Sequence, residues 1–325
     1  MRFGRYIFLY LLLLPLCVNA QDGKSTFDFL SLSSSAHTNA LGGRNISLID
    51  DDASLIFQNP ALLSSLSDNS INFNFMTYMQ GCKMGSASFA KIAGERGTWG
   101  VTTQFMGYGS MKETLETGEV LGDMKALDMC IGGMYSYSLT DYWVGAATGK
   151  IIYSKYGTYS SFALAADLAL NYFDAEKDLS FSVVAANLGG QIKAFGDVHE
   201  RVPFNLQCGL TKSIAHAPVR LSLTLVDLTR WSSKYYYNAQ KTPNFGHILM
   251  NHLNFGIDIV PSDIFYLAAG YNFRRAYELK AAGSSHMSGL TFGAGVNVKR
   301  FKLGLAYAKY HVSTPSLTFS LGYSL

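Results

Sequence analysis

The sequence is poor in charged residues, which make up 15% of its 325 positions, against about a quarter in ordinary globular proteins. Lys and Arg number 26 and Asp and Glu number 23, which gives a formal net charge of +3. Binding to nucleic acid requires a clustered excess of basic charge, so we expect no nucleic-acid partner. Disordered chains combine high charge with few aromatic residues, and this chain has the opposite composition.

Cysteines and metal-binding motifs are also scarce. The chain has four cysteines, and once Cys17 is removed with a leader segment, Cys82, Cys130 and Cys208 remain. Three widely spaced cysteines do not make a disulfide scaffold. No CxxC, HExxH or Cys/His cluster is present, so we expect no metal site. The absence of a GxSxG elbow and of a phosphate-binding glycine loop predicts a protein without catalytic residues and without a cofactor.

Long apolar runs are missing except at the N-terminus. Residues 1–20 contain two arginines, an apolar stretch from Tyr6 to Leu14 and compact residues just before Gln21. The apolar stretch is far shorter than the roughly 20 residues needed to span a bilayer as a helix. The order of these parts is typical of a secretory signal peptide. We therefore expect residues 1–20 to be a signal peptide that is cleaved before Gln21.

Aromatic residues and glycines, in contrast, are abundant, with 21 Phe, 20 Tyr and 31 Gly. Apolar and polar residues alternate with period two, which places them on opposite faces of a strand. The last ten residues show this alternation clearly, with Leu317, Phe319, Leu321, Tyr323 and Leu325 on one face. The other face carries small, weakly charged residues, which suits the interior of a membrane barrel whose apolar face contacts lipid.

About fourteen such segments follow one another along the chain. They begin near Ser70, Cys82, Thr98, Ala126, Tyr142, Ser160, Leu179, Phe204, Pro218, Asn251, Ile264, Ser288, Phe301 and Ser316. The connections between them alternate between short and long, and the long ones are expected at 108–125, 189–203, 229–250 and 274–287. Short turns on one side and longer loops on the other are typical of outer-membrane barrels. The sequence therefore predicts an all-β, 14-stranded antiparallel transmembrane β-barrel over residues 70–325.

Residues 21–69 do not show the alternation of a strand. They contain seven large apolar residues that need burial, together with a Gly42-Gly43 pair and three consecutive acids, Asp50 to Asp52. Because exposing the apolar residues would cost free energy, we expect this segment to fold into the barrel lumen as an N-terminal hatch. The acids lack the spacing of a calcium loop, and we expect them to cap a short helix over 53–57.

The hatch segment resembles the opening of a known family. Phe29-Leu30, Ser35-Ala36, Ala40-Leu41-Gly42-Gly43, Asp50-Asp51-Asp52 and Asn59-Pro60-Ala61 are similar to the start of the FadL-like outer-membrane barrels. Within that superfamily the pattern most resembles the PorQ/PorV group of the type IX secretion system, and PorQ above all. Ala186-Asn187-Leu188-Gly189 and Val202-Pro203-Phe204 agree with it. Two departures are His37, where the group usually has Arg, and Leu325, where barrels commonly end in Phe.

The resemblance implies a location in the outer membrane of a Gram-negative cell. It also implies that the hatch motif consists of Asn59, Pro60, Ala61, Gly42, Gly43 and Asp51. A PorQ-like barrel would anchor a surface protein of the attachment complex, in the company of a sortase and a second barrel. Outer-membrane lipid would be its other partner.

Aromatic residues within the expected 229–250 loop are candidates for partner binding. Trp231, Tyr235, Tyr236 and Tyr237 lie there with basic residues nearby, and exposed aromatic and basic residues are frequent in protein interfaces.

Three alternatives to the anchor remain open. A FadL-like transporter of hydrophobic molecules would need an apolar lumen, whereas the polar faces of the segments are dominated by Gly, Ser and Asn. A PorV-like shuttle would bind many exported cargo proteins. A general porin would need an open lumen, and a folded hatch inside fourteen strands should leave little room for water.

Overall fold

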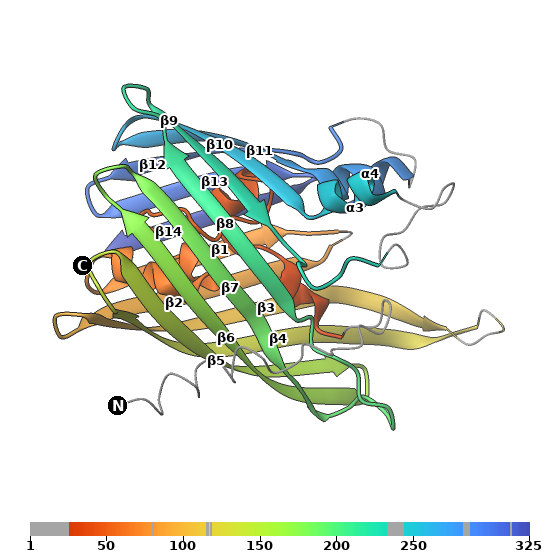
Figure 1. Cartoon of the computed structure of the whole chain (residues 1–325). Coiled ribbons are helices and arrows are strands. Elements are labelled where there is room, and N and C mark those ends of the chain that lie inside the picture. The colour runs from red at the N-terminus through yellow and green to blue at the C-terminus, as the bar shows by residue number, and fades with distance from the viewer. Residues whose placement is uncertain are drawn as a thin grey trace.

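Fourteen strands within the described residues close into one antiparallel barrel around a small N-terminal segment (Figure 1). The computed structural model describes residues 26–79, 81–114, 117, 119–232, 244–281, 287–312 and 314–325. The expected signal peptide lies outside these residues. The all-β, 14-stranded barrel predicted from the sequence is confirmed.

The strands begin where the alternation predicts, with one exception. Thirteen of the fourteen starts agree within two residues, and only β4 begins earlier, at Val120 instead of near Ala126. The strands are β1 Ser70–Thr77, β2 Lys83–Ala93, β3 Gly97–Thr114, β4 Val120–Ser138, β5 Trp143–Tyr156, β6 Tyr159–Asp174, β7 Leu179–Lys193, β8 Asn205–Ser213, β9 Val219–Leu225, β10 Leu253–Ser262, β11 Phe265–Asn272, β12 Leu290–Val298, β13 Phe301–Ala308 and β14 Ser316–Ser324.

Each strand pairs with its neighbours in the chain, and β1 pairs with β14 to close the ring. In that closing pair Ser70 lies opposite Ser324 and Thr77 lies opposite Leu317. Closure leaves no free sheet edge along the wall, which satisfies the backbone hydrogen bonds in a membrane. Along β14, Phe319 and Leu321 point outward and are exposed, whereas Thr318 points inward and is buried.

The two ends of the barrel differ in their connections. At the end where β1 begins and β14 finishes, which we call the short-turn end, the turns cover only 94–96, 139–142, 175–178, 214–218, 263–264 and 299–300. The opposite end, the long-loop end, carries the longer connections. None of the helices in the described ranges is long and apolar enough to cross a bilayer.

Two of the expected loops contain helices. α3 covers Phe245–Asn251 and α4 covers Phe273–Ala281, and they contact each other beyond the wall at the long-loop end (Figure 1). Asn244 begins α3 by accepting a hydrogen bond from the His247 amide, and Asn272 accepts one from the Arg275 amide at the start of α4. Such caps stabilise short helices, but a helix of two turns gives too little periodicity to stand out in a sequence.

The expected loop 108–125 is also largely ordered, as a hairpin formed by the ends of β3 and β4. It projects beyond the neighbouring strands, since β2 pairs with β3 only as far as Gly107. Lys112 lies directly opposite Asp123 in the hairpin, and opposite charges in that position favour strand pairing. The prediction of a loop was therefore wrong for most of this segment.

The hatch consists of short helices within the lumen: η1 Asp28–Ser31, α2 Ala36–Ala40, η2 Leu55–Phe57 and η3 Pro60–Ser65. Its described part begins at the long-loop end, where the Thr26 amide donates to the Arg201 carbonyl. It then runs to the short-turn end, with α2 against β11–β14 and η3 against β3–β6. The red and orange segments inside the barrel in Figure 1 show this course.

The wall is shaped to receive α2. Glycines on β10, β11 and β12 face the helix, and a Cβ atom at Gly256, Gly270 or Gly293 would lie within 2.8 Å of the hatch. The atoms in contact belong to the backbone and side chains of residues 40–42. Because an added side chain would collide there, the glycines are needed for the close approach of helix and wall.

Candidate functional site

Asn59, Pro60 and Ala61 fix the start of η3. Asn59 is fully buried; its Oδ1 accepts from the Ala61 amide at 2.9 Å, and its Nδ2 donates to the Ile46 carbonyl at 2.6 Å. Pro60 occupies the first position of η3, where its fixed φ suits the helix and no amide is needed. Ala61 packs without exposed surface against Ile46 and Val184. The three residues thus join two parts of the hatch and fit them to the wall.

Gly42 and Gly43 form the tight turn after α2, with φ values of 92° and 89°. Side chains disfavour this left-handed region, and glycine adopts it freely. The Gly42 amide donates to Thr291 Oγ1 on β12, and the Gly42 carbonyl accepts from Asn272. A Cβ at Gly43 would lie 2.6 Å from Nη2 of Arg275, so the turn also makes room for a side chain from α4.

Asp51 attaches the hatch to β13. Its Oδ2 lies 2.6 Å from Nζ of Lys302, and its carboxylate accepts from both the amide and the hydroxyl of Ser67. Partial burial alone would raise the pKa of Asp51, but the hydrogen bonds from Lys302 and Ser67 outweigh it and lower the pKa. Asp52 accepts from the Ser54 amide through its side chain and from the Leu55 amide through its carbonyl, in the turn just before η2.

His37 makes a second attachment of hatch to wall. Its Nε2 lies 2.9 Å from Oδ1 of Asp258 on β10, and its ring stacks on Tyr266 of β11 at 3.8 Å between centroids. Arg220 on β9 lies 3.4 Å from Asp258 and 3.5 Å from Asp50. Burial of His37 lowers its pKa, but the charge and hydrogen bond of Asp258 and the charge of Asp50 outweigh this, so the pKa is raised.

A small cavity of about 20 Å³ lies between these attachments. His37, Asp52, Asn72 and Lys302 are among its lining residues, and two buried polar atoms, His37 Nδ1 and Asn72 Oδ1, have no hydrogen-bond partner among the described residues. This space suffices for one water molecule, which needs such polar partners. Burial raises the pKa of Asp52. No group of three His, Cys, Asp or Glu side chains suited to a metal occurs in the described part of the chain.

The lumen is apolar on one side of its long-loop half. Phe27 and Phe29 of the hatch pack there against inward-facing wall residues that include Met76, Met84 and Met106. This lumen cluster continues with Cys130, Ile152, Ala163, Ala165 and Val202. Gly, Ser and Asn dominate the polar faces of the strands, as the sequence analysis noted, but methionines occupy inward positions of β1, β2 and β3 near their long-loop ends and make this side of the lumen apolar. Methionine fills irregular apolar spaces and adapts to different contacts.

An exposed apolar patch lies at the long-loop end. Trp231 stacks on Phe245 of α3, with 6.1 Å between ring centroids, and Leu249 and Met250 of the same helix are also exposed. We call these four residues the Trp231 patch. Phe245 has 71% of its surface exposed, the highest value in the patch. The remaining predicted partner-binding residues, Tyr235, Tyr236 and Tyr237, lie outside the described residues.

The surroundings of the Trp231 patch are polar. Arg230 and Arg274 pair with Asp227, and Arg274 also pairs with Glu278 at 2.8 Å. Because ion pairs favour water over hydrocarbon, the patch belongs to the part of the molecule above the lipid. Exposed apolar side chains in such a place are characteristic of protein-binding surfaces.

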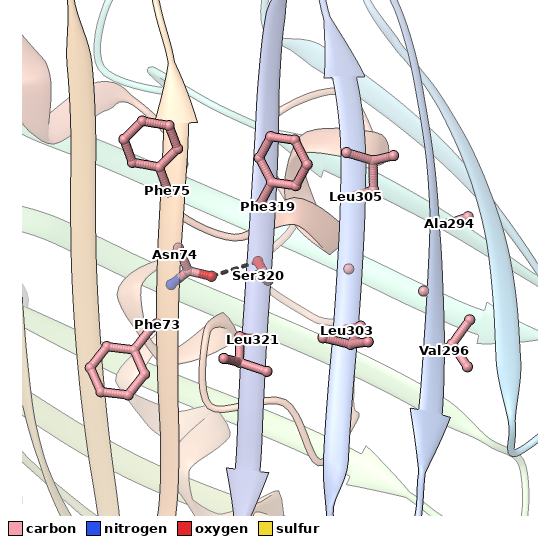
Figure 2. A pocket seen from close by; sticks show the side chains of 12 residues that line it. Phe73, Asn74, Phe75, Ala294, Val296, Leu303, Leu305, Phe319, Ser320 and Leu321 are labelled. Atoms are coloured by element: carbon pink, nitrogen blue, oxygen red, sulfur yellow. Dashed lines mark hydrogen bonds between the residues drawn. The ribbon is translucent and has the colours of Figure 1, made fainter.

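A groove of about 590 Å³ crosses the outer, lipid-facing side of β1, β14, β13 and β12. Figure 2 shows it between two rows of outward side chains, Phe75-Phe319-Leu305-Ala294 and Phe73-Leu321-Leu303-Val296. The strand backbones at Asn74, Ser320, Gly304 and Gly295 form its floor. Behind the floor the Tyr266 ring covers Gly295, leaving no space for a Cβ atom there. The groove is open near Ala294, the smallest side chain in the two rows.

The structure brings some of the sequence-predicted residues together and separates others. Asn59, Pro60, Ala61, Gly42, Gly43 and Asp51 all lie in the hatch at its contacts with itself or with the wall, whereas Trp231 lies at the rim. The sequence analysis missed Asp258, Arg220 and Tyr266, which hold His37, and Phe245, which stacks on Trp231. Isolated charges on otherwise weakly charged strands were a usable signal for the first two.

Comparisons with known proteins place the fold. No family model matches the chain, and no curated protein sequence matches it. Among solved structures, the crystal structure of a Pseudomonas aeruginosa FadL homologue is similar with a TM-score of 0.54 and 11% identity, over 90% of this chain and 98% of that one. The CymD monoaromatic hydrocarbon channel gives a TM-score of 0.55 at 12% identity, over 92% and 98%.

The Pseudomonas putida toluene transporter TodX is similar as well, with a TM-score of 0.53 and 13% identity over 93% of this chain and 97% of that one. Two of these three structures are named as a hydrocarbon channel and a toluene transporter, and the third is named as a FadL homologue. At such low identity the likeness shows the fold alone. The chain therefore has the fold of the FadL-type, 14-stranded barrels of the Gram-negative outer membrane.

Proposed function

We propose that this chain is a non-enzymatic adaptor in the outer membrane, which binds a protein partner at its long-loop end as a PorQ-like component of a type IX secretion attachment complex. The observation that carries the proposal is the Trp231 patch, an apolar surface held in place by a helix above the lipid. The hatch motifs support the family, since their resemblance to the PorQ/PorV group covers residues 27–63.

The geometry suggests how such an adaptor would work. The hatch is bound to the wall on several sides, by Asp51 and Lys302, by His37 and Asp258, and by α2 against its glycine-lined wall. A rigid support lowers the entropic cost of binding at its surface. Trp and Phe side chains are large and lose little conformational freedom, so Trp231 and Phe245 are the expected hot spots.

In-cell cross-linking of the tagged protein, followed by mild detergent extraction and mass spectrometry, tests the adaptor. We expect one abundant surface protein, recovered together with a sortase or a second barrel, and we expect Trp231→Ser with Phe245→Ser to reduce that recovery at least tenfold. A matched control is Tyr159→Ser with Ile192→Ser, which removes two other exposed side chains from β6 and β7. Equal recovery with all variants would contradict the role of the patch, and recovery of many exported proteins would indicate a PorV-like shuttle.

A second candidate is the binding and passage of hydrophobic molecules, and the fold comparisons favour it over the adaptor. Its specific support in this chain is the lumen cluster, where Met84 and Met106 line the inner wall beside Phe29. A small hydrophobic molecule in that region would displace the phenyl rings of the hatch and contact the methionines in their place. The apolar lining would bind it by excluding water.

Binding of toluene to the purified protein, measured by calorimetry, tests this candidate. Met84→Ser with Met106→Ser should weaken binding about tenfold or more, whereas Met129→Ser, which changes an outward-facing methionine on β4, should have no effect. No measurable binding by the unchanged protein would reject the candidate. Stepwise ion conductance in planar bilayers would instead indicate a porin, which the filled lumen argues against.

A further inference from the structure

The lipid-facing groove lies near the short-turn end of the barrel. Leu303 is the third residue of β13, and Phe73 is the fourth residue of β1. At about 3.3 Å per residue and a tilt of roughly 40°, the groove lies about 5–13 Å along the barrel axis from the first residues of these strands. In outer-membrane barrels the short turns face the periplasm, so the groove lies in the periplasmic leaflet. That leaflet is formed by phospholipids.

The turn directly beneath the groove is the only basic one among the six short turns. Residues 299–300 join β12 to β13, the two strands that form one end of the groove, and both residues are cations, Lys299 and Arg300. When only the residues between the strands are counted, the other five turns have a net charge of 0 or −1. Turns 94–96 and 214–218 are neutral, since Glu95 offsets Arg96 in the first and the second has no Lys, Arg, Asp or Glu. Each of the other three carries −1, from Asp141, from Glu176, Lys177 and Asp178 together, and from Asp263. The +2 charge therefore distinguishes this turn from the rest of the ring.

Both cations are available for an external partner. Lys299 and Arg300 are exposed, and neither forms an ion pair within the described residues. Lys302, three residues further on, points inward and is occupied by Asp51. The Ser324 amide donates to the Arg300 carbonyl, which holds this turn against β14. Phe301 and Tyr323 pack together at this boundary, 4.9 Å apart, as aromatic residues do at a lipid interface.

We propose that this sector is a binding site for one glycerophospholipid of the periplasmic leaflet, with an acyl chain in the groove and the phosphate at Lys299 and Arg300. Val296 at the groove lies three residues before Lys299, roughly 10 Å along the strand, which matches the separation of an acyl chain from its headgroup. The groove volume falls within the range of about 300–1,000 Å³ found for sites of bound organic molecules. The apolar rows and the basic turn thus complement the two halves of a phospholipid (Figure 2).

Native mass spectrometry of the full-length protein with added phosphatidylglycerol tests the site. We expect the unchanged protein to retain one phosphatidylglycerol molecule after the others have dissociated. Lys299→Ser with Arg300→Ser should weaken retention about thirtyfold, because each cation at the lipid interface contributes roughly fivefold to the affinity for an anionic headgroup and the two contributions multiply. Ala294→Trp should also reduce retention, because a large side chain at this position closes the end of the groove.

Matched variants separate this site from general effects. Lys91→Ser with Arg96→Ser removes two exposed cations at the β2–β3 turn, beyond the β1 side of the groove and away from Lys299 and Arg300, and Ala147→Trp enlarges an exposed, lipid-facing residue on β5. Both should retain the lipid like the unchanged protein. Equal retention by all variants, or an equal loss with Lys91→Ser and Arg96→Ser, would overturn the proposal. A lipid-free dimer that Ala294→Trp disrupts would also overturn it, since the groove would then bind a second copy of the chain.

Discussion

The hatch and the rim at the long-loop end differ in the contacts that stabilise them and in how well the sequence predicts them. The hatch is buried, hydrogen bonded within itself and attached to several strands, and its motifs resemble those of a known family. The rim carries short helices, a projecting hairpin and exposed apolar residues, and little of it was foreseen. The difference indicates that the recognisable motifs specify a plugged barrel, whereas the partner binding that we propose depends on the rim.

Breaking the hatch should have the largest effect on stability. Asn59→Ala leaves the Ile46 carbonyl and the Ala61 amide without their buried partner, which should cost about 2–4 kcal/mol of unfolding free energy. Amide exchange of the hatch should accelerate accordingly. Ser64→Ala, which removes an exposed hydroxyl from the same helix, is the control and should change stability by less than about 0.5 kcal/mol. Similar exchange in both variants would contradict the structural role of the motif.

Loosening one attachment should have a smaller effect. Asp51→Asn removes the ion pair with Lys302, and since Asp51 is about one-third exposed, solvent screening limits the loss to about 1 kcal/mol or less. Because the folded pKa of Asp51 is lowered, its contribution is present above the unfolded pKa and is lost as pH falls through the folded pKa. Hatch protection measured against pH should therefore decline in acid, and Asp51→Asn should remove that decline.

Because of His37, we expect hatch protection to decline at alkaline pH as well. The folded pKa of His37 is raised, so its contribution is fully present below the unfolded value of about 6.5 and is lost as pH rises through the folded pKa. Asp258, Asp50, Arg220 and Tyr266 face the ring and remain in place in His37→Gln. This variant should flatten the alkaline side of the hatch-protection profile. A profile that is unchanged by His37→Gln would show that another group controls it.

The rim variants should have a small effect on stability. Trp231→Ser with Phe245→Ser removes side chains that are 41% and 71% exposed, and Trp231 also donates to the Leu228 carbonyl, so the unfolding free energy should fall by about 1 kcal/mol or less while partner recovery falls. Thermal unfolding in detergent, run beside the cross-linking experiment, measures both quantities on the same samples. A large loss of stability would show that the patch stabilises the fold and that recovery falls because the variant is partly unfolded.

Much of the fold could be predicted because a lipid-exposed strand must alternate apolar and polar residues. Strands such as β14 repeat this pattern often enough to fix their starts within two residues. The ends of β3 and β4 failed this criterion, because beyond the lipid both faces of the hairpin meet water and the alternation disappears. α3 and α4 were missed for a related reason, since each is short and stabilised by capping and contacts with its neighbour.

The candidate sites were less predictable than the wall. Asn59, Gly42 and Asp51 were found through resemblance, but Asp258 lies 221 residues from His37, and only barrel closure brings them together. The lumen cluster was missed because Met84 and Met106 are inward residues on strands whose other inward positions are polar. The lipid-facing groove depends on the heights of neighbouring side chains, which no single strand reveals.

The glycine-lined wall has a consequence for biogenesis. The hatch precedes every strand in the chain, yet α2 lies against β11–β14, the strands that are synthesised last. Gly256, Gly270 and Gly293 hold the hatch in close contact with the wall, and the pairing of β1 with β14 leaves the closed wall without a lateral gap for the helix to enter. We therefore expect the first folded segment to stay within reach until β14 meets β1, so that insertion of the wall and enclosure of its contents are completed in the same step.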